Sequence, residues 1–254
     1  MQRYNVIVNV LTALSAALLM TACAETTTPE SAASAVTPQA RQATPAAGGR
    51  PAPKPLPLGF FVTSIGLGDG GNLGGLAGAD AHCQMLAEKV GSGNRTWRAY
   101  LSTQATATTA AVNAIDRIGE GPWGNAKGLN MAADIQHLLF DNSTFNVEHI
   151  LTETGEQVNS RVIGKTPNKH DILTGTQIDG TAFPAGEDRT CNNWTSNSDD
   201  NKAMVGHSDR YRFKFSGSPW NAAHPSRGCS QKALQGSGGD GLFYCFAADQ
   251  IAEQ

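Results

Sequence analysis

The feature that most constrains this chain is a set of four cysteines between residues 83 and 245: Cys83, Cys191, Cys229 and Cys245. In an exported domain an even number of cysteines indicates disulfides, so these four predict two bridges, for which three pairings are possible. The sequence contains no Cys-x-x-Cys pair and no cysteine–histidine cluster at zinc spacing. The pattern therefore predicts covalent cross-links rather than a structural zinc site.

The N-terminal residues predict export. Residues 1–5 carry one cation, Arg3, and residues 6–20 form an apolar run that is too short for a permanent transmembrane helix. Residues 19–23, Leu-Met-Thr-Ala-Cys, resemble the lipobox of bacterial lipoproteins, in which the peptide before the cysteine is removed and the cysteine is acylated. We therefore expect a signal peptide over 1–22 and a lipid on Cys23. The simpler alternative is an ordinary secretory signal with a chance cysteine.

The expected lipid also indicates a location. Ala24, rather than an aspartate, follows the cysteine, which resembles the class of lipoproteins sorted to the outer membrane. No later stretch of the sequence is apolar enough to span a bilayer, so the lipid is the expected attachment to the membrane. We expect an exported protein that is lipid-anchored at the outer membrane or cell surface.

Composition divides the mature chain into a tether and one domain. Residues 23–57 are rich in Ala, Thr, Pro, Ser and Gln, which cannot bury enough apolar surface to offset the entropy of ordering, so we expect a disordered tether. Residues 58–254 are the size of one domain with a substantial core. The chain has a formal charge of −3. The signal holds one cation and the tether a net charge of +1, so the domain lies near −5 and is a poor candidate for binding nucleic acid.

Hydrophobic patterning predicts an α+β domain with long loops. Apolar residues at helical spacing predict helices over 79–90 and 131–140, and short apolar or alternating runs predict strands at 59–64, 97–101, 210–215 and 241–246. The segment 142–218 is mostly polar and glycine-rich. Irregular segments of that length inside a compact domain are usually functional or held by cross-links.

Several motifs together resemble endostatin, the C-terminal module of certain collagens. They are residues 70–83, which end in Gly-Ala-Asp-Ala-His-Cys, residues 98–102, the Cys-Asn-Asn-Trp of 191–194, and Tyr-Cys-Phe at 244–246. Endostatin has a variant of the C-type lectin-like fold, so the resemblance implies a mixed sheet with two helices and long loops. It also implies two nested disulfides, Cys83–Cys245 and Cys191–Cys229. A shared fold indicates architecture better than function.

The resemblance also raises the question of metal cofactors. Sugar-binding C-type lectins hold calcium through a Pro-containing acidic triplet and a Trp-Asn-Asp triplet. Here the corresponding residues are Gln-Ile-Asp at 177–179 and Trp-Asn-Ala at 220–222, so expected oxygen ligands are missing. If calcium binds, Asp179 and Asn221 are its ligands; otherwise we expect no cofactor. Endostatin's N-terminal zinc-binding histidines have no counterpart here, because no histidine precedes residue 60.

Two short segments place acids beside histidines. They are His170-Asp171 and His207-Ser208-Asp209. Such pairs in polar loops are usually only solvated, and a catalytic triad is a spatial rather than a sequential arrangement. No Gly-x-Ser-x-Gly or His-Glu-x-x-His motif accompanies them.

The leading hypothesis is therefore a binding module rather than an enzyme. We expect an envelope-anchored, lectin-like domain that recognises a glycan, or a protein of the envelope or of the extracellular space, through its long loops. The candidate ligand-binding residues lie close to Cys191 and Cys229: Asp179, Asp188, Asn192, Asn221 and Trp220. The alternatives are an extracytoplasmic hydrolase that uses loop histidines, and a structural envelope protein without a small ligand.

The lipid anchor gives the first testable prediction. Metabolic labelling with a palmitate analogue should mark the wild-type protein and not a Cys23→Ser variant, because the cysteine thiol is the acylated group. Label that persists in the variant would exclude Cys23 as the site.

Overall fold

The computed structural model describes residues 54–211 and 219–249. The predicted signal peptide, Cys23 and most of the predicted tether lie outside the described residues, as does most of the strand expected at 210–215. The end of the predicted tether contacts the domain, since the backbone N–H of Leu56 donates to the carbonyl of Gly128 at 3.0 Å. Within the described residues, no helix combines the length and the apolar character that a membrane span requires.

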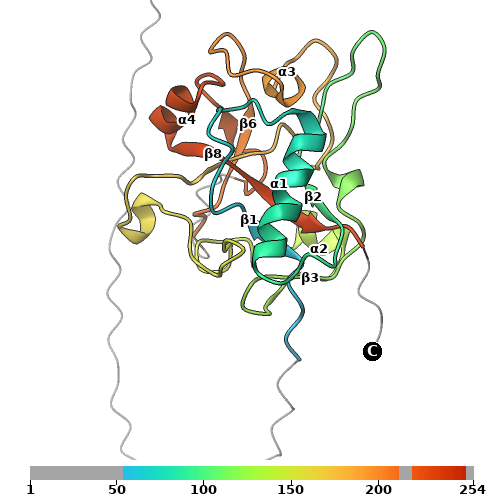
Figure 1. Ribbon diagram of the computed structural model, residues 1–254, viewed down its shortest axis with the longest axis vertical. Helices are drawn as coiled ribbons and strands as arrows, with labels where there is room; N and C mark the ends of the chain where they lie inside the picture. Colours follow the sequence, from blue (N-terminus) through green and yellow to red (C-terminus); the bar gives the residue numbers. More distant parts are fainter. Residues whose placement is uncertain (1–53, 212–218, 250–254) are drawn as a thin grey trace, which may run out of the picture. The chain divides into compact units, whose positions relative to one another are not determined.

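The fold is α+β, and its centre is the strand β8 (Gly239–Ala247). The main sheet is mixed and runs in the order β1-β8-β5-β6-β7, with β2 also paired to β8. The other five strands are β1 (Phe60–Val62), β2 (Trp97–Ala99), β5 (Asp171–Leu173), β6 (Met204–His207) and β7 (His224–Pro225). β1 and β2 pair with β8 antiparallel and β5 pairs with it parallel. The red arrow of β8 crosses the middle of the domain in Figure 1.

β8 is buried on both of its faces. Side chains alternate across a strand, and those of Phe243 and Cys245 join one hydrophobic cluster, whereas those of Leu242, Tyr244 and Phe246 join another. This explains why residues 241–246 read as one continuous apolar run instead of an alternating one. The predicted closing strand is confirmed and is central.

The helix α1 (Gly75–Lys89) covers one face of β8. Its buried side chains include Ala79, Cys83 and Leu86, which recur at helical spacing, as predicted. It begins four residues earlier than expected, directly after Gly74, which has a φ of 73°. The glycine-rich run before residue 79 therefore supplies the first turn of the helix as well as a loop.

Asp80, the acidic residue of the Gly-Ala-Asp motif, has a structural role. Its carboxylate accepts the backbone N–H of Ala99 at 2.9 Å and two hydrogen bonds from Arg117, at 2.7 and 2.8 Å. Both of these bonds come from Nη2 of Arg117, and hydrogen bonds between charged groups are among the stronger polar contacts in proteins. Asp80 thus ties α1 to the end of β2 and to the short 3-10 helix Ile115–Arg117.

The described residues contain four α-helices where the sequence predicted two. α2 (Ile135–Phe140) is shorter than the expected helix over 131–140, because Met131 belongs to β4 (Asn130–Ala132), which pairs with β3 (Trp123–Gly124). The two unpredicted helices, α3 (Cys191–Trp194) and α4 (Gln231–Ser237), are too short to show an apolar period. A second 3-10 helix spans Arg161–Ile163.

Two disulfides cross-link the domain. Cys83 of α1 pairs with Cys245 of β8, and Cys191 of α3 pairs with Cys229 before α4. The expected pairing is confirmed, and in chain order Cys191–Cys229 lies within the loop that Cys83–Cys245 closes. In the folded chain each bridge joins a different pair of elements, so the two are separate cross-links rather than a nested pair.

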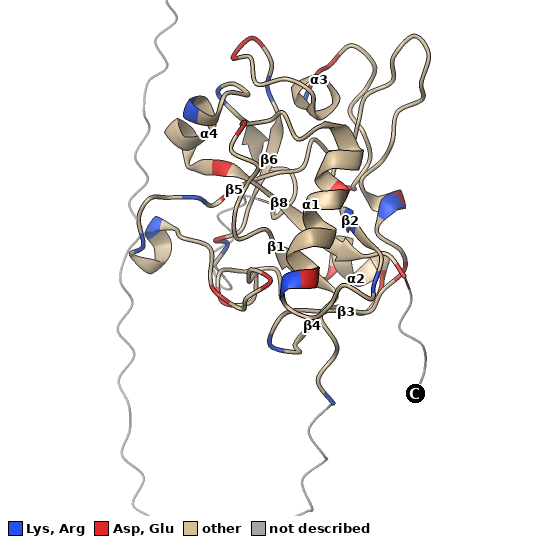
Figure 2. Cartoon of the chain, viewed as in Figure 1, with Lys and Arg blue, Asp and Glu red and all other residues tan. Residues whose placement is uncertain are grey.

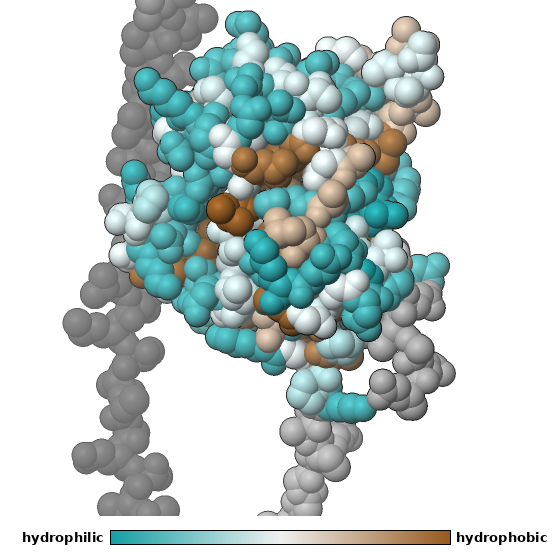
Figure 3. Space-filling model, in the orientation of Figure 1, coloured by the Kyte–Doolittle hydropathy of each residue, from teal (hydrophilic) through white to brown (hydrophobic). Residues whose placement is uncertain are grey.

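In the orientation of Figure 2, Lys and Arg are interspersed with Asp and Glu along the described chain. In the same orientation, the face that Figure 3 shows consists mainly of hydrophilic residues, with hydrophobic ones in a limited band. This face of the described domain is therefore polar and of mixed charge.

The two bridges should contribute unequally to stability. Their cysteines are 162 and 38 positions apart, and the chain-entropy model gives about 5 and about 4 kcal/mol for such loops. The double variant Cys83→Ser/Cys245→Ser should therefore lose more free energy of unfolding in urea than Cys191→Ser/Cys229→Ser. Equal or reversed losses would show that the cross-link between α1 and β8 is not the dominant one.

Candidate functional site

Histidines and aspartates gather where β5, β6 and β7 lie side by side. The cluster consists of Asp171 on β5, His207 on β6, His224 on β7, and the flanking His170 and Asp209. Asp171 lies directly opposite His207 in the antiparallel register. His224 lies opposite Val205, two residues from His207, so the side chains of His207 and His224 share a face of the sheet. We call these five residues the His/Asp cluster.

The carboxylate of Asp171 is the centre of this cluster. Its side chain is 2% exposed, and its Oδ1 lies 3.1 Å from Nε2 of His170, 3.3 Å from Nε2 of His207 and 3.7 Å from Nε2 of His224. Despite these short distances, neither carboxylate oxygen receives a hydrogen bond from the part of the chain that the structure describes. Buried carboxylates are normally satisfied, so this one requires an explanation.

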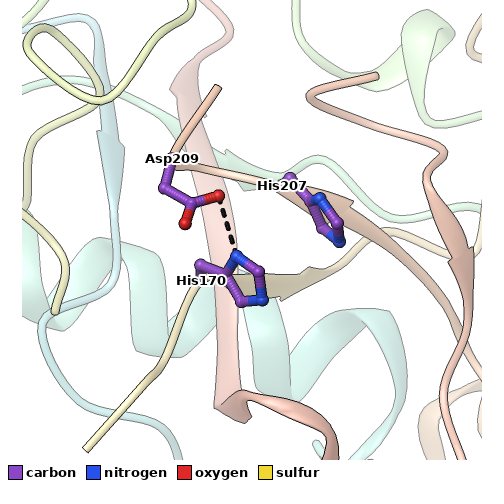
Figure 4. Close-up of side chains that lie close together, drawn as sticks. All are labelled: His170, His207 and Asp209. Carbon is purple, nitrogen blue, oxygen red and sulfur yellow. Dashed lines mark hydrogen bonds and ion pairs between the residues drawn. The ribbon is translucent and has the colours of Figure 1, made fainter. Parts of the chain in front are cut away.

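The rings of the three histidines are held in defined orientations. His170 Nδ1 lies 2.8 Å from Asp209 Oδ1, the contact drawn in Figure 4, and its ring stacks on that of His207 with centroids 4.5 Å apart. His224 Nδ1 lies 3.0 Å from the carbonyl oxygen of Pro225, and its Nε2 lies 3.0 Å from Nε2 of His207. A carbonyl only accepts, so the proton of a neutral His224 is on Nδ1, and its Nε2 is the acceptor in the contact with His207.

The cluster has two kinds of chemical capability. Burial lowers the pKa of His170, but the hydrogen bond and charge of Asp209, with the charge of Asp171, raise it more, so the pKa lies above its ordinary value. A histidine oriented by a carboxylate is the arrangement that general bases use. Imidazole nitrogens and a carboxylate oxygen are also the donors that bind transition metals.

The predicted stacking residue is part of the core. Trp220 is 1% exposed and packs against Phe145, Tyr100 and Tyr244, with ring centroids 4.6, 4.9 and 5.2 Å away. It therefore presents no free ring face to a ligand. Asn221 is also 1% exposed, and its amide donates to the hydroxyl of Tyr100 and to the carbonyl of Ile178.

The remaining predicted ligand residues stabilise loops. Asp179 accepts from the N–H and hydroxyl of Thr181, and these hydrogen bonds lower its pKa. Asp188 accepts from the backbone N–H groups of Thr190 and Asn192. The five predicted residues thus hold separate turns and the core. Within the described residues, neither cluster with metal-ligand geometry contains any of them.

The turn that carries Asn192 is left-handed. Cys191, Asn192, Asn193 and Trp194 have φ values of 49°, 54°, 53° and 64°, a conformation that costs an L-residue about 1–2 kcal/mol. Asparagine adopts it more readily than most residues, which accounts for the two central positions. The buried Trp194 anchors the turn, because its indole N–H donates to the carbonyl of Ser102 at 2.8 Å.

A depression of about 490 Å³ between α1 and β2 is a weaker candidate. Its lining residues are Ala77, Asp80, Ala81, Gln84, Trp97 and Arg98. Asp80 already receives the hydrogen bonds described above, and Trp97 is fully buried. This depression therefore lacks the unsatisfied buried group that distinguishes the His/Asp cluster.

Sequence reasoning found part of the cluster without recognising it. His170, Asp171, His207 and Asp209 were noted as two local pairs, and the expectation was that such pairs are solvated. His224 was missed, because it lies 17 residues from His207 and precedes a proline that ends any apolar pattern. The available signal was weak: β5, β6 and β7 are two to four residues long, which is too short for periodicity to reveal their pairing.

Comparison of the chain with protein-family models and with curated protein sequences gives no match.

The left-handed turn gives a prediction at Asn192. Glycine has no Cβ and occupies this conformation freely, so Asn192→Gly should retain the stability of the wild type, whereas the β-branched Asn192→Val should lose about 1–2 kcal/mol. Urea unfolding of both variants checks this, and a valine variant as stable as the wild type would contradict the left-handed geometry.

Proposed function

We propose that this protein is an envelope-anchored binding module with a C-type lectin-like, endostatin-like fold, which recognises a glycan or protein ligand at the rim formed by β5, β6 and β7. The proposal combines three elements: an N-terminus resembling a lipoprotein signal, a cross-linked α+β domain, and a polar site at one end of its sheet. The partly exposed His/Asp cluster is the observation that carries the choice of site.

Several features support the lectin-like fold. The disulfides pair the first cysteine of the domain with the last and the second with the third, as the resemblance implies. The sheet is mixed, and the residues between β5 and β8 are mainly loops and short elements. Cross-linked loops of this kind keep a binding surface ordered, which lowers the entropy lost when a ligand binds.

Exposure favours this rim as the binding surface. The His224 side chain is 40% exposed, whereas those of His207 and His170 are 16% and 20% exposed, so the cluster has a solvent-facing side above a buried carboxylate. Tyr211, two residues beyond Asp209, is 55% exposed and offers an aromatic surface that the buried tryptophans do not. An aromatic face beside hydrogen-bonding groups suits both sugars and protein loops.

The choice of partner follows from the charge. A domain near −5 with interspersed surface charges favours neutral glycans or proteins over nucleic acid. A domain of net negative charge is also a poor partner for anionic lipid, so the expected lipid on Cys23 is the proposed contact with the membrane. The ligand would therefore lie in the envelope or on another surface that the tethered domain reaches.

A second candidate function is an extracytoplasmic hydrolase. The His170–Asp209 contact of 2.8 Å favours it, because an oriented imidazole is a suitable proton acceptor. Ser208 is 3% exposed, and its hydroxyl is directed to the carbonyl of His170, so it is poorly placed as a nucleophile. The hydrolase reading accordingly needs a nucleophile other than this serine.

Binding by the mature protein should depend on His224. On a glycan array, and in photo-cross-linking to isolated envelopes, His224→Ala should lose at least about tenfold in binding, the effect of removing one good polar contact. His137→Ala is the matched control, because His137 is also exposed but lies on α2, outside the cluster. Equal binding by all three proteins would place the ligand elsewhere.

Hydrolysis is tested separately. If the second function holds, wild-type protein should turn over a panel of aryl esters and His170→Ala should reduce the rate by about 100-fold or more, the usual contribution of a general base. Turnover that is unchanged in His170→Ala would remove the hydrolase proposal.

A further inference from the structure

We propose that Asp171, His207 and His224 form a binding site for one transition-metal ion, of the kind that holds Zn²⁺. This site goes beyond the proposed function, because it requires neither a glycan nor a protein ligand. It is argued from the distances between the three donor atoms, the state of Asp171 and the orientation of the histidines.

The three donor atoms have the spacing of ligands around a single ion. Bonds to zinc of about 2.0–2.1 Å place neighbouring ligand atoms of a tetrahedral site about 3.3 Å apart. Here Asp171 Oδ1 is 3.3 Å from His207 Nε2 and 3.7 Å from His224 Nε2, and the two nitrogens are 3.0 Å apart. One separation equals the expected value, and the other two lie on either side of it.

The buried carboxylate supplies an independent reason for an ion. The Asp171 side chain is 2% exposed, and among the described residues neither of its oxygens accepts a well-aligned hydrogen bond, although Oδ1 faces three imidazole nitrogens at 3.1, 3.3 and 3.7 Å. Neutral imidazoles do not balance the charge of a carboxylate, and buried charges are normally paired or bound to metal. A divalent cation between the three side chains would neutralise Asp171 and use the oxygen that the histidines already face.

The surroundings of the histidines match those of metal ligands. A ligating histidine usually donates its other ring N–H to a carbonyl or carboxylate, which fixes the tautomer. The Pro225 carbonyl is 3.0 Å from His224 Nδ1, so the lone pair of His224 Nε2 is directed to His207 and Asp171, where it takes part in the 3.0 Å contact with His207 Nε2. An ion that both nitrogens ligate would replace that contact. His170, held by Asp209, faces the same Oδ1 of Asp171 at 3.1 Å.

The donor set selects the class of metal. Two imidazoles and one carboxylate suit zinc and other late first-row ions, whereas calcium prefers six to eight oxygens. Three protein ligands also leave a tetrahedral ion one position for water or an added ligand. The 40% exposure of His224 gives that position a route to solvent.

The experiment uses metal ions alone as probes of the whole mature protein. After removal of metals with a chelator, isothermal titration with Zn²⁺ should show one site, and Co²⁺ should develop the visible absorption of a nitrogen-ligated, low-coordinate ion. His224→Ala should weaken Zn²⁺ binding by more than about 100-fold, since loss of an outer-shell partner alone costs about 10–100-fold. Ca²⁺ should not compete at equal concentration.

Controls separate loss of the ligand from loss of the fold. His137→Ala should bind Zn²⁺ as the wild type does, because His137 lies on α2 outside the cluster. Asp171→Asn should also abolish binding; if this buried variant does not fold, His224→Ala, which changes a partly exposed residue, carries the test. Zn²⁺ binding that is absent from the wild type, or equal in the wild type and His224→Ala, would overturn the site, whatever the outcome of the ligand-binding assays.

Discussion

The structure depends on one strand that is buried on both faces. β8 pairs with β1 on one edge and with β5 and β2 on the other, and its side chains enter both hydrophobic clusters. Neither face of a strand in this position is open to solvent, so each buried side chain must be apolar or have its polar atoms hydrogen-bonded. Tyr244 meets the second condition, since its buried hydroxyl donates to the carbonyl of Trp220 at 2.8 Å. The bridge from Cys245 to Cys83 adds a covalent link between β8 and α1.

The centre of the sheet, at β8, contrasts with its edge at β5, β6 and β7. At β8 the sequence has an uninterrupted apolar run, and burial of apolar surface stabilises the fold by about 25 cal/mol for each Å². The strands β5, β6 and β7 of the same sheet are only two to four residues long, and they carry Asp171, His207 and His224. Polar groups so close to the core reduce stability unless they are satisfied. These polar groups are the basis of the binding role that we propose for this edge of the sheet.

Sequence patterns predicted the parts of the fold that have long or continuous signals. The apolar run of β8, the helical spacing of α1 and the resemblance that paired the cysteines all proved sufficient. The cluster could not be predicted in the same way, because the pairing of Asp171 with His207 and the approach of His224 depend on contacts between distant short strands. The burial of Trp220 and Asn221 could not be predicted for a related reason. Nearness to a cysteine in sequence did not specify which side of the chain faces the core.

The core and the candidate site are physically connected through the segment that precedes β7. Tyr244 of β8 holds the Trp220 carbonyl, and a Cβ on Gly206 would lie 1.7 Å from that same oxygen. Only glycine allows β6 to pass so close, and the next residue along β6 is His207. His224 lies four residues after Trp220, and the pairing of β7 with β6 sets its position. The packing of one aromatic residue in the core thus fixes the separation of two histidines at the surface, which is the rigid support that a metal or ligand site requires.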